Sequence, residues 1–276
     1  MNLVAKFLVS NQPDSAIFST VTQPTPLPLP KLRLSEPVLF VWILLGFNAL
    51  AIGLYYSGVY GLQQIVAPTM EVLRPAQWRE FGLLEFVQHG LLLAIIWVLV
   101  KSALANRSVV ERVLLAGATA AFVFLFLEEI DYGLHFYELA TGKYAAVSAR
   151  NWHNQWGGEL ENATVLKRLN DAVIILWFIL LPLLTRVPRL GAWLRRFPLV
   201  PSLWFTLGFF LSLVCSKFAH YLDDQGLAVI NGVDGNLSGT IAEFRETSTY
   251  YLYFLYALTI SKLNPMLYRP REVSSG

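Results

Sequence analysis

Long apolar runs separated by short polar segments dominate the chain from residue 38 onward. A helix needs about 20 mostly apolar residues to cross the hydrocarbon core of a bilayer. Six runs come near or above that length: 38–60, 82–100, 109–128, about 169–184, 202–222 and 240–261. We therefore predict an all-α, polytopic integral membrane protein with about six transmembrane helices.

Composition agrees with this interpretation. The chain of 276 residues is 55% hydrophobic and only 14% charged, with a mean hydropathy of +0.50. A soluble domain carries about 25% charged residues, so much of this surface is expected to face lipid. The net charge of +2 gives no reason to expect a nucleic-acid partner. Cys215 is the single cysteine, which excludes an intrachain disulfide and a zinc knuckle.

The predicted organisation has three parts. Residues 1–36 form an N-terminal interfacial segment and a proline-rich linker, and residues 37–265 form the membrane domain, with an outer loop at 132–165. Residues 266–276 form a cytoplasmic tail. Within the domain, Pro75 is expected to open the second helix, since the first turn tolerates its missing N–H.

Two helix ends carry their own signals. The third span is expected to continue as helix to Leu139, with Gly142 near its C-cap. The sixth span is expected to start at a capping box formed by Thr240 and Glu243.

Basic residues predict the orientation. With six spans both termini lie on one side, and that side holds 13 Lys and Arg against 6 on the other. The positive-inside rule places this side, and both termini, in the cytoplasm. The acids and histidines distribute the other way: 15 of 19 acids and all four histidines fall on the outer half. Solvated loop charge does not explain acids and histidines inside the ends of four helices, so we expect a functional site there.

Helical spacing groups these residues on shared faces. Glu85 and His89 are four apart, and Glu128, Asp131 and His135 follow a 0, 3, 7 pattern. The fifth and sixth spans add further polar positions, among which Lys217 lies one turn deeper than the others on its span: Lys217, His220, Asp223, Asp224, Glu243, Arg245, Glu246 and Thr247.

Helices that present inward carboxylates and imidazoles are the usual way to build a metal site in a bundle. We predict a divalent metal, zinc first and iron or manganese second, because the donors are imidazole and carboxylate without thiolate. The predicted ligands are Glu85, His89, Glu128, His220, Asp224 and Glu246. Glu128, Glu129 and Asp131 are the predicted catalytic group, with Glu129 or Asp131 as general base on a metal-bound water.

The loop NWHNQWGGELEN is interpreted as a lid, because its amides, indoles and glycines suit a polar cover at the membrane interface. The residues predicted to act as lid or second layer are His135, His153, Asn154, Gln155, Glu159 and Lys217.

Structural alternatives stay open. Lys217 and Arg245 can instead neutralise Glu85 and Glu246 in buried ion pairs with no metal. Glu243 can be only a capping residue. Asp223 and Asp224 can belong to a solvated turn, although a helix C-terminus disfavours anions by about 0.3–1 kcal/mol.

Two resemblances rest on the same residues. The run LEEIDYG at 127–133, followed by Asn151, Asn154 and Gln155 and then by ELEN at 159–162, resembles a group of uncharacterised bacterial multi-span proteins with an EE-I-x-x-G motif. That likeness implies a single unit and no activity. The pair Glu128-Glu129 with His220-x-x-x-Asp224 resembles part of the intramembrane CAAX-type glutamate protease pattern, although Gly133 stands at that pattern's arginine position.

The expected function is a membrane-embedded, metal-dependent enzyme, with hydrolysis favoured and di-iron oxidation second. Its substrate is expected to be a lipid or lipid-linked molecule reached from the outer leaflet of a bacterial inner membrane, with the site facing the periplasm. Two alternatives remain: a structural or assembly subunit that docks a protein partner through the outer loops, and a proton- or cation-coupled transporter.

Overall fold

The structure, a computed structural model, describes residues 35–59, 61–62, 66, 83–105, 109–143, 156–157, 160–194, 199–227, 229–230, 233–234 and 237–261. The predicted N-terminal segment, the helix start at Pro75, most of the lid loop and the C-terminal tail lie outside these residues.

The described part of the chain is mainly helical, which confirms the all-α part of the predicted fold class. Its helices are η1 (Val38–Trp42), α1 (Ile43–Tyr55), α3 (Leu83–Ala105), α4 (Val109–Glu129), η3 (Asp131–Gly133), α5 (Leu134–Thr141), α6 (Asn162–Val173), η5 (Ile174–Leu180), α7 (Leu181–Leu184), α8 (Pro188–Leu194), α9 (Leu203–Asp224) and α10 (Leu237–Ile260). Two antiparallel pairs of two-residue strands join some of them: β1 (Trp156–Gly157) with β2 (Leu160–Glu161), and β3 (Val229–Ile230) with β4 (Val233–Asp234).

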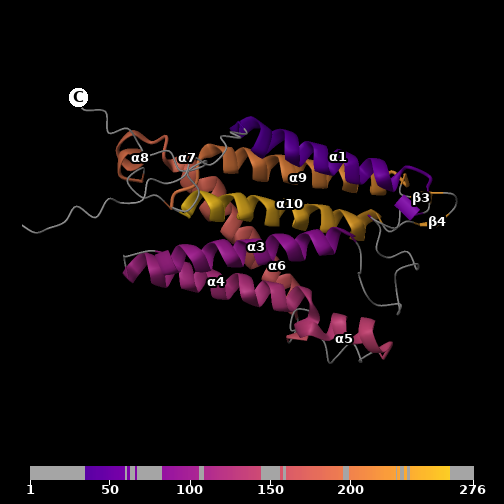
Figure 1. The fold of residues 1–276 in the computed structure, drawn as a ribbon. Helices are drawn as coiled ribbons and strands as arrows, with labels where there is room; N and C mark the ends of the chain where they lie inside the picture. Colours follow the sequence, from indigo (N-terminus) through magenta and orange to yellow (C-terminus); the bar gives the residue numbers. More distant parts are fainter. Residues whose placement is uncertain are drawn as a thin grey trace, which may run out of the picture. The chain divides into compact units, whose positions relative to one another are not determined.

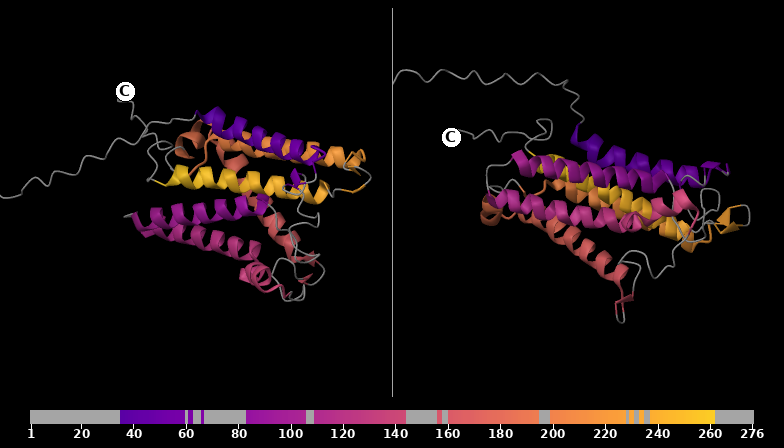
Figure 2. Two further views of the ribbon diagram at one scale, coloured as in Figure 1. Left: turned by 45° about the vertical axis from the view of Figure 1, so that its right-hand side comes forward. Right: turned by 60° about the horizontal axis from the view of Figure 1, so that its bottom comes forward.

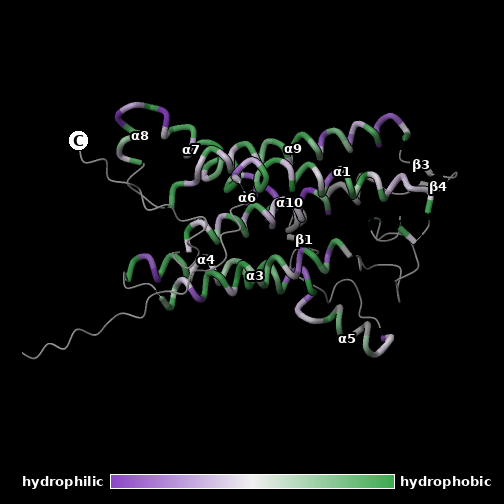
Figure 3. Tube along the Cα trace, turned by 45° about the horizontal axis from the view of Figure 1, so that its top comes forward, coloured by the Kyte–Doolittle hydropathy of each residue, from purple (hydrophilic) through white to green (hydrophobic). Residues whose placement is uncertain are grey.

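Several of these helices are long and apolar enough to cross a membrane. Four qualify in the described residues: Val38–Tyr55, Leu84–Ala105, Val109–Glu129 and Leu203–Asp224. A fifth results if Val165–Leu184 and Pro188–Leu194, which are bent by 116°, form one span. Figure 3 shows mainly hydrophobic stretches along α3 and α9, with hydrophilic residues toward one end of α9. These helices support a multi-pass membrane protein.

Helix α10 lies among the others. It packs against α3 and α9 along its length and also contacts α1, while α4 packs on the far side of α3 (Figure 1). The helix formed by α6 and η5 meets α9 through η5, and its first part diverges from the neighbouring helices (Figure 2, right). α10 has 24 residues, and Glu243, Arg245 and Glu246 make it more polar than its partners.

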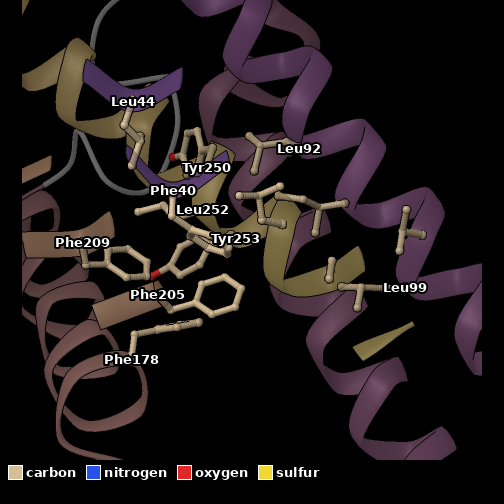
Figure 4. Packing of buried hydrophobic residues seen from close by; sticks show 14 of the residues in the cluster. Phe40, Leu44, Leu92, Leu99, Phe178, Phe205, Phe209, Tyr250, Leu252 and Tyr253 are labelled. Atoms are coloured by element: carbon tan, nitrogen blue, oxygen red, sulfur yellow. The ribbon is translucent and has the colours of Figure 1, made fainter. Parts of the chain in front are cut away.

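Aromatic side chains fill the core between α10, α9 and η5. Phe178 lies 4.8 Å from Phe209 and 5.5 Å from Tyr253 between ring centroids (Figure 4). Leu92 of α3 and Leu252 of α10 continue this core and are fully buried. Each aromatic ring buries a large area, and ring pairs at these distances add about 0.5–1.5 kcal/mol beyond that burial.

A glycine on α9 makes room for a buried leucine of α10. A Cβ atom at Gly208 of α9 would lie 2.7 Å from Cδ2 of Leu252 and 3.5 Å from Cδ1 of Leu44. A side chain at this position would therefore require the Leu252 methyl group to move. Gly208 leaves room for Leu252 at the contact between α9 and α10.

The predicted continuation of the third span as one helix to Leu139 is wrong. α4 ends at Glu129, and Asp131 (φ 48°), Tyr132 (φ 54°) and Gly133 (φ 88°) adopt left-handed backbone conformations that break the helix before α5. The predicted role of Gly142 agrees with the structure, since it follows α5 with a φ of 64°.

Two other predicted boundaries are corrected. The first span ends at Tyr55, and Gly58, with a φ of 69°, lies in the turn that follows it, so the helix does not reach Tyr60. α10 begins at Leu237. Thr240 therefore lies inside the helix, and the predicted capping box is wrong.

Candidate functional site

A buried amide links α3 to α10. The Gln88 side chain has 0% exposure, and its Nε2 donates to the Glu243 carboxylate at 2.8 Å, to Thr247 Oγ1 at 3.1 Å and to the Glu243 backbone carbonyl at 3.3 Å. Thr247 also donates to the Glu243 carbonyl one turn back at 2.8 Å. Glu243 is therefore a buried structural acceptor between two helices, a role the sequence did not reveal.

A second pair of carboxylates lies at the end of α4. The Tyr250 hydroxyl of α10 donates to Glu129 Oε1 at 2.7 Å, and the Tyr132 hydroxyl donates to Glu128 Oε1. Glu128 is 2% exposed and Asp131 is 4% exposed. The three predicted catalytic residues thus lie at one helix end, where α10 contributes a phenol to the same cluster. We call Glu85, His89, Glu128, Glu129, Asp131, Glu243, Tyr250 and their bonded partners the acid cluster.

The backbone that carries this cluster is strained. Asp131 and Tyr132 are consecutive non-glycine residues with positive φ. Left-handed backbone costs an L-residue roughly 1–2 kcal/mol. The strain is maintained by the surrounding contacts, since Asp131 is buried and Tyr132 bonds back to Glu128. Such strain concentrates at functional sites, so this kink is the strongest backbone sign of one here.

Tyr132 lies beyond the apolar part of α4. Its hydrogen bond to the Glu128 carboxylate, together with partial desolvation and the negative charge of Glu128, raises the pKa of the phenol above its ordinary value of 10.0. Because the phenol then keeps its proton over the physiological range, Tyr132 acts as a hydrogen-bond donor to Glu128.

Glu85 and His89 are both buried on α3, in agreement with the expectation that they share an inward face. The imidazole ring of His89 lies 6.0 Å from the ring of Phe126 in α4 and 6.3 Å from that of Phe86, in edge-to-face geometry. His89 is therefore placed at the α3–α4 contact, next to the helix end that carries Glu128 and Glu129.

Arg245 lies on the opposite side of α10. Arg245 forms an ion pair with Asp171 of α6, and both are partly exposed. The adjacent Asn170 accepts a hydrogen bond from the Tyr253 hydroxyl at 2.7 Å. The alternative that paired Arg245 with Glu85 or Glu246 did not include Asp171, which here supplies the partner.

A cavity of about 430 Å³ adjoins this ion pair between α6, η5, α9 and α10. Its charged and imidazole lining comes from Lys167, Asp171, Lys217, His220 and Arg245. The remaining lining is apolar or hydroxylic: Ile174, Ile175, Ile179, Phe209, Phe210, Ser212, Leu213, Ser216 and Thr249. We call this space the basic cavity.

The structure thus divides the predicted metal ligands. Glu85, His89 and Glu128 belong to the acid cluster, whereas His220 lines the basic cavity and both Asp224 and Glu246 are exposed. Within the described residues, no three His, Cys, Asp or Glu side chains lie in a group that could hold a metal ion. The six predicted ligands are not assembled. The His135 side chain and His153, Asn154, Gln155 and Glu159 lie outside the described parts.

Sequence reasoning missed the roles of three side chains. Gln88 and Tyr250 belong to the acid cluster and bond Glu243 and Glu129, whereas Asp171 lies beside the basic cavity and pairs with Arg245. Spacing contains a signal for two of them. Gln88 is three residues after Glu85, and Tyr250 is seven after Glu243, so each shares a helix face with a predicted residue.

Compared with protein-family models, curated proteins and solved structures, the chain matches none of them. The two resemblances described above therefore stay predictions, and function has to be argued from the site.

Proposed function

We propose that this chain is a six-span integral membrane enzyme with cytoplasmic termini that hydrolyses an ester or phosphoester bond of a lipid or lipid-linked substrate at the outer membrane interface. The main observation that supports this proposal is the strained turn at Asp131–Gly133. It follows the end of an apolar helix, where Glu128, Glu129 and Asp131 lie together. Ionisable groups at such a depth are costly and are retained where they serve function.

In this proposal Glu129 is the general base. As a carboxylate it accepts a proton from water, whose oxygen bonds to the acyl or phosphoryl centre while the substrate's ester oxygen leaves with a proton. Tyr250 orients Glu129 through its 2.7 Å hydrogen bond, and Tyr132 does the same for Glu128. The proton that Glu129 takes from water then passes to the leaving oxygen, which balances the step, and the buried Asp131 completes the group of carboxylates at this helix end.

A divalent metal remains a further part of the proposal. His89 and Glu128 lie in the acid cluster, and the loop residues His153 and Glu159, outside the described chain, would have to add ligands. Elemental analysis of the intact protein tests this, with about one zinc per chain expected, or about two irons for an oxidase.

The transporter alternative is less favoured, because an apolar layer follows the acid cluster along the bundle. Leu92, Ile95 and Leu99 of α3 and Leu252 and Leu255 of α10 are all buried there. A path for protons or cations would need titratable or hydrated positions in this layer.

The test uses the purified protein with a total polar lipid extract from bacterial membranes. Wild type is expected to produce a new lysolipid, free fatty acid or dephosphorylated lipid, and Glu129→Gln is expected to lower its rate about 100-fold or more, the contribution of a general base. Glu111→Gln, on the other end of α4, is the matched control and should keep the rate. Lipid profiles that are identical with and without wild-type protein would contradict the enzyme and favour the assembly subunit.

A further inference from the structure

The basic cavity has a gradient of polarity along its length. On α9, Phe210, Leu213, Lys217 and His220 follow helical spacing on one face, so the wall is apolar first and basic afterwards. On α6 and η5 the order is antiparallel, with Lys167 before Ile174 and Ile175. Both walls therefore place their cations at the same end and their apolar side chains at the other.

Charge at the basic end is in surplus. Arg245 is paired with Asp171, which is the one acid among the described lining residues. Lys167 and Lys217 then add two positive charges, and both side chains are exposed. A ligand that fits this end carries a compact anion.

The apolar end of the basic cavity opens toward the lateral surface of the helices. Ile175, Phe210 and Leu213 line the cavity and are also exposed on the lateral surface of apolar helices. Phe210 and Lys217 are seven residues apart, which is about 10 Å along the helix. A volume of about 430 Å³ lies within the range of ligand-binding sites, roughly 300–1,000 Å³.

We propose that the basic cavity binds an anionic phospholipid, with its phosphate against Lys167, Lys217 and His220 and with one acyl chain against η5 and α9. The inference goes beyond the proposed hydrolysis and does not depend on it, since the acid cluster faces α3 and α4. The lipid would fill the space where α6 diverges from the bundle and hold it against α9.

The experiment titrates full-length protein, purified in a neutral detergent, with dioleoyl phosphatidylglycerol or dioleoyl phosphatidylcholine and counts bound lipid by intact-protein mass spectrometry. The chains are identical, so a difference reports the headgroup. Wild type should prefer phosphatidylglycerol. The double variant Lys167→Gln/Lys217→Gln should bind it about 25-fold more weakly, since each lysine near an anionic lipid contributes about 1 kcal/mol, or about fivefold.

The matched control is Arg168→Gln, which removes one exposed charge from the neighbouring position of α6, outside the cavity lining. It should retain wild-type affinity. A second variant, Leu213→Trp, fills the apolar end without changing charge and should weaken both lipids. Lys167 and Lys217 are exposed, so their replacement should leave the protein folded and monodisperse.

Four outcomes would overturn the proposal. Equal binding of the two lipids, or unchanged affinity in the double variant, would mean that Lys167 and Lys217 do not contact the lipid phosphate. Equal weakening by Arg168→Gln would mean a diffuse charge effect. Competition by millimolar glycerol phosphate or inorganic phosphate as effective as that by lipid would mean that the site takes a free phosphate.

Discussion

The two sides of α10 differ in how their polar groups are buried and bonded. Toward α3 and α4 the helix presents Glu243, Thr247 and Tyr250, all buried and bonded to neighbouring side chains. Toward α6 and α9 it presents Arg245 and Thr249, beside an open space with surplus positive charge. The first arrangement suits chemistry that needs fixed groups, and the second suits capture of an anion.

Helical geometry produces this separation from a short stretch of sequence. At about 100° per residue, Glu243, Thr247 and Tyr250 fall within about 60° of one another. Arg245 lies about 200° away from Glu243 by the same rule. Residues that are adjacent in sequence therefore serve two unrelated sites, and a cluster in sequence is no guide to a cluster in space.

The largest expected effect comes from Gln88→Leu, which removes the amide that bonds Glu243 and Thr247. It leaves a buried carboxylate without this donor, so we expect a loss of about 2–3 kcal/mol in the free energy of unfolding. The measurement is reversible unfolding in mixed detergent and dodecyl sulfate micelles.

Gln225→Leu is the control for this variant, because Gln225 is exposed at the end of α9. It should change stability by less than about 0.5 kcal/mol. Equal effects of the two substitutions would mean that the α3–α10 bridge contributes nothing specific.

The next effect compares hydroxyl groups on the two sides. Tyr250→Phe removes a hydrogen bond to the Glu129 carboxylate, and Tyr253→Phe removes one of equal length, 2.7 Å, to the neutral Asn170 amide. Bonds to charged groups contribute about 1.5–3 kcal/mol against about 0.5–1.5 for neutral ones. Tyr250→Phe should therefore destabilise more. If Tyr253→Phe destabilises more than Tyr250→Phe in the same unfolding assay, the hydrogen bonds of the acid cluster are not the stronger ones.

A smaller effect concerns the kink. Gly133→Ala should destabilise by about 1 kcal/mol because φ is 88°, although nothing lies within 4 Å of the added Cβ. Gly117→Ala, in the middle of α4 with equally open space, should be neutral or stabilising by up to about 1 kcal/mol. Comparable destabilisation by the two substitutions would show that the positive φ at position 133 does not require a glycine.

The smallest effects are spectroscopic. The pKa of Tyr132 is raised chiefly because its hydroxyl donates a hydrogen bond to the Glu128 carboxylate. The pKa of Tyr56 is raised chiefly by burial and further by the negative charge of Asp223. A raised phenol pKa stabilises the folded state fully below pH 10, and this contribution is lost as the pH rises through the folded-state value. Tyrosinate absorbance during alkaline titration follows both groups.

Each substitution should move one tyrosine. Glu128→Gln should lower the pKa of Tyr132 toward 10 and leave Tyr56 unchanged, whereas Asp223→Asn should lower only the pKa of Tyr56. If either variant shifts the pKa of both tyrosines, the structure has changed generally. That result would contradict the pairing of Glu128 with Tyr132 and of Asp223 with Tyr56.

Hydrophobic pattern and charge predicted most of the helices here, since run length and the ends of apolar stretches are properties of the chain itself. The span from 202 to 222, for example, agrees with α9 within two residues at each end. The direction in which each side chain points from its helix was harder to predict from the sequence. His89 and His220 were both predicted to bind one metal ion, but packing turned them toward different neighbours, Phe126 and the basic cavity.

The kink could not be read from residue types. Asp131 and Gly133 are poor helix formers, but their types do not specify two consecutive left-handed residues at Asp131 and Tyr132. The buried contacts of Asp131 and the bond between Tyr132 and Glu128 stabilise that backbone. Strain of this kind is maintained by tertiary structure, which a single sequence does not display.

The polarity of α10 has a consequence for how the protein is made. A charged side chain in a nascent span costs up to about 2.5–3.5 kcal/mol during insertion through the translocon, with the highest cost at the helix centre. Glu243, Arg245 and Glu246 lie in the first half of α10, which is not among the helices that qualify as spans in the described residues, so α10 is expected to insert poorly by itself. Both of its main partners, α3 and α9, precede it in chain order, so they are in place when it is synthesised. In the proposed six-span arrangement, membrane integration of α10 is thus expected to depend on helices already inserted, and a defect in α3 should leave α10 outside the membrane.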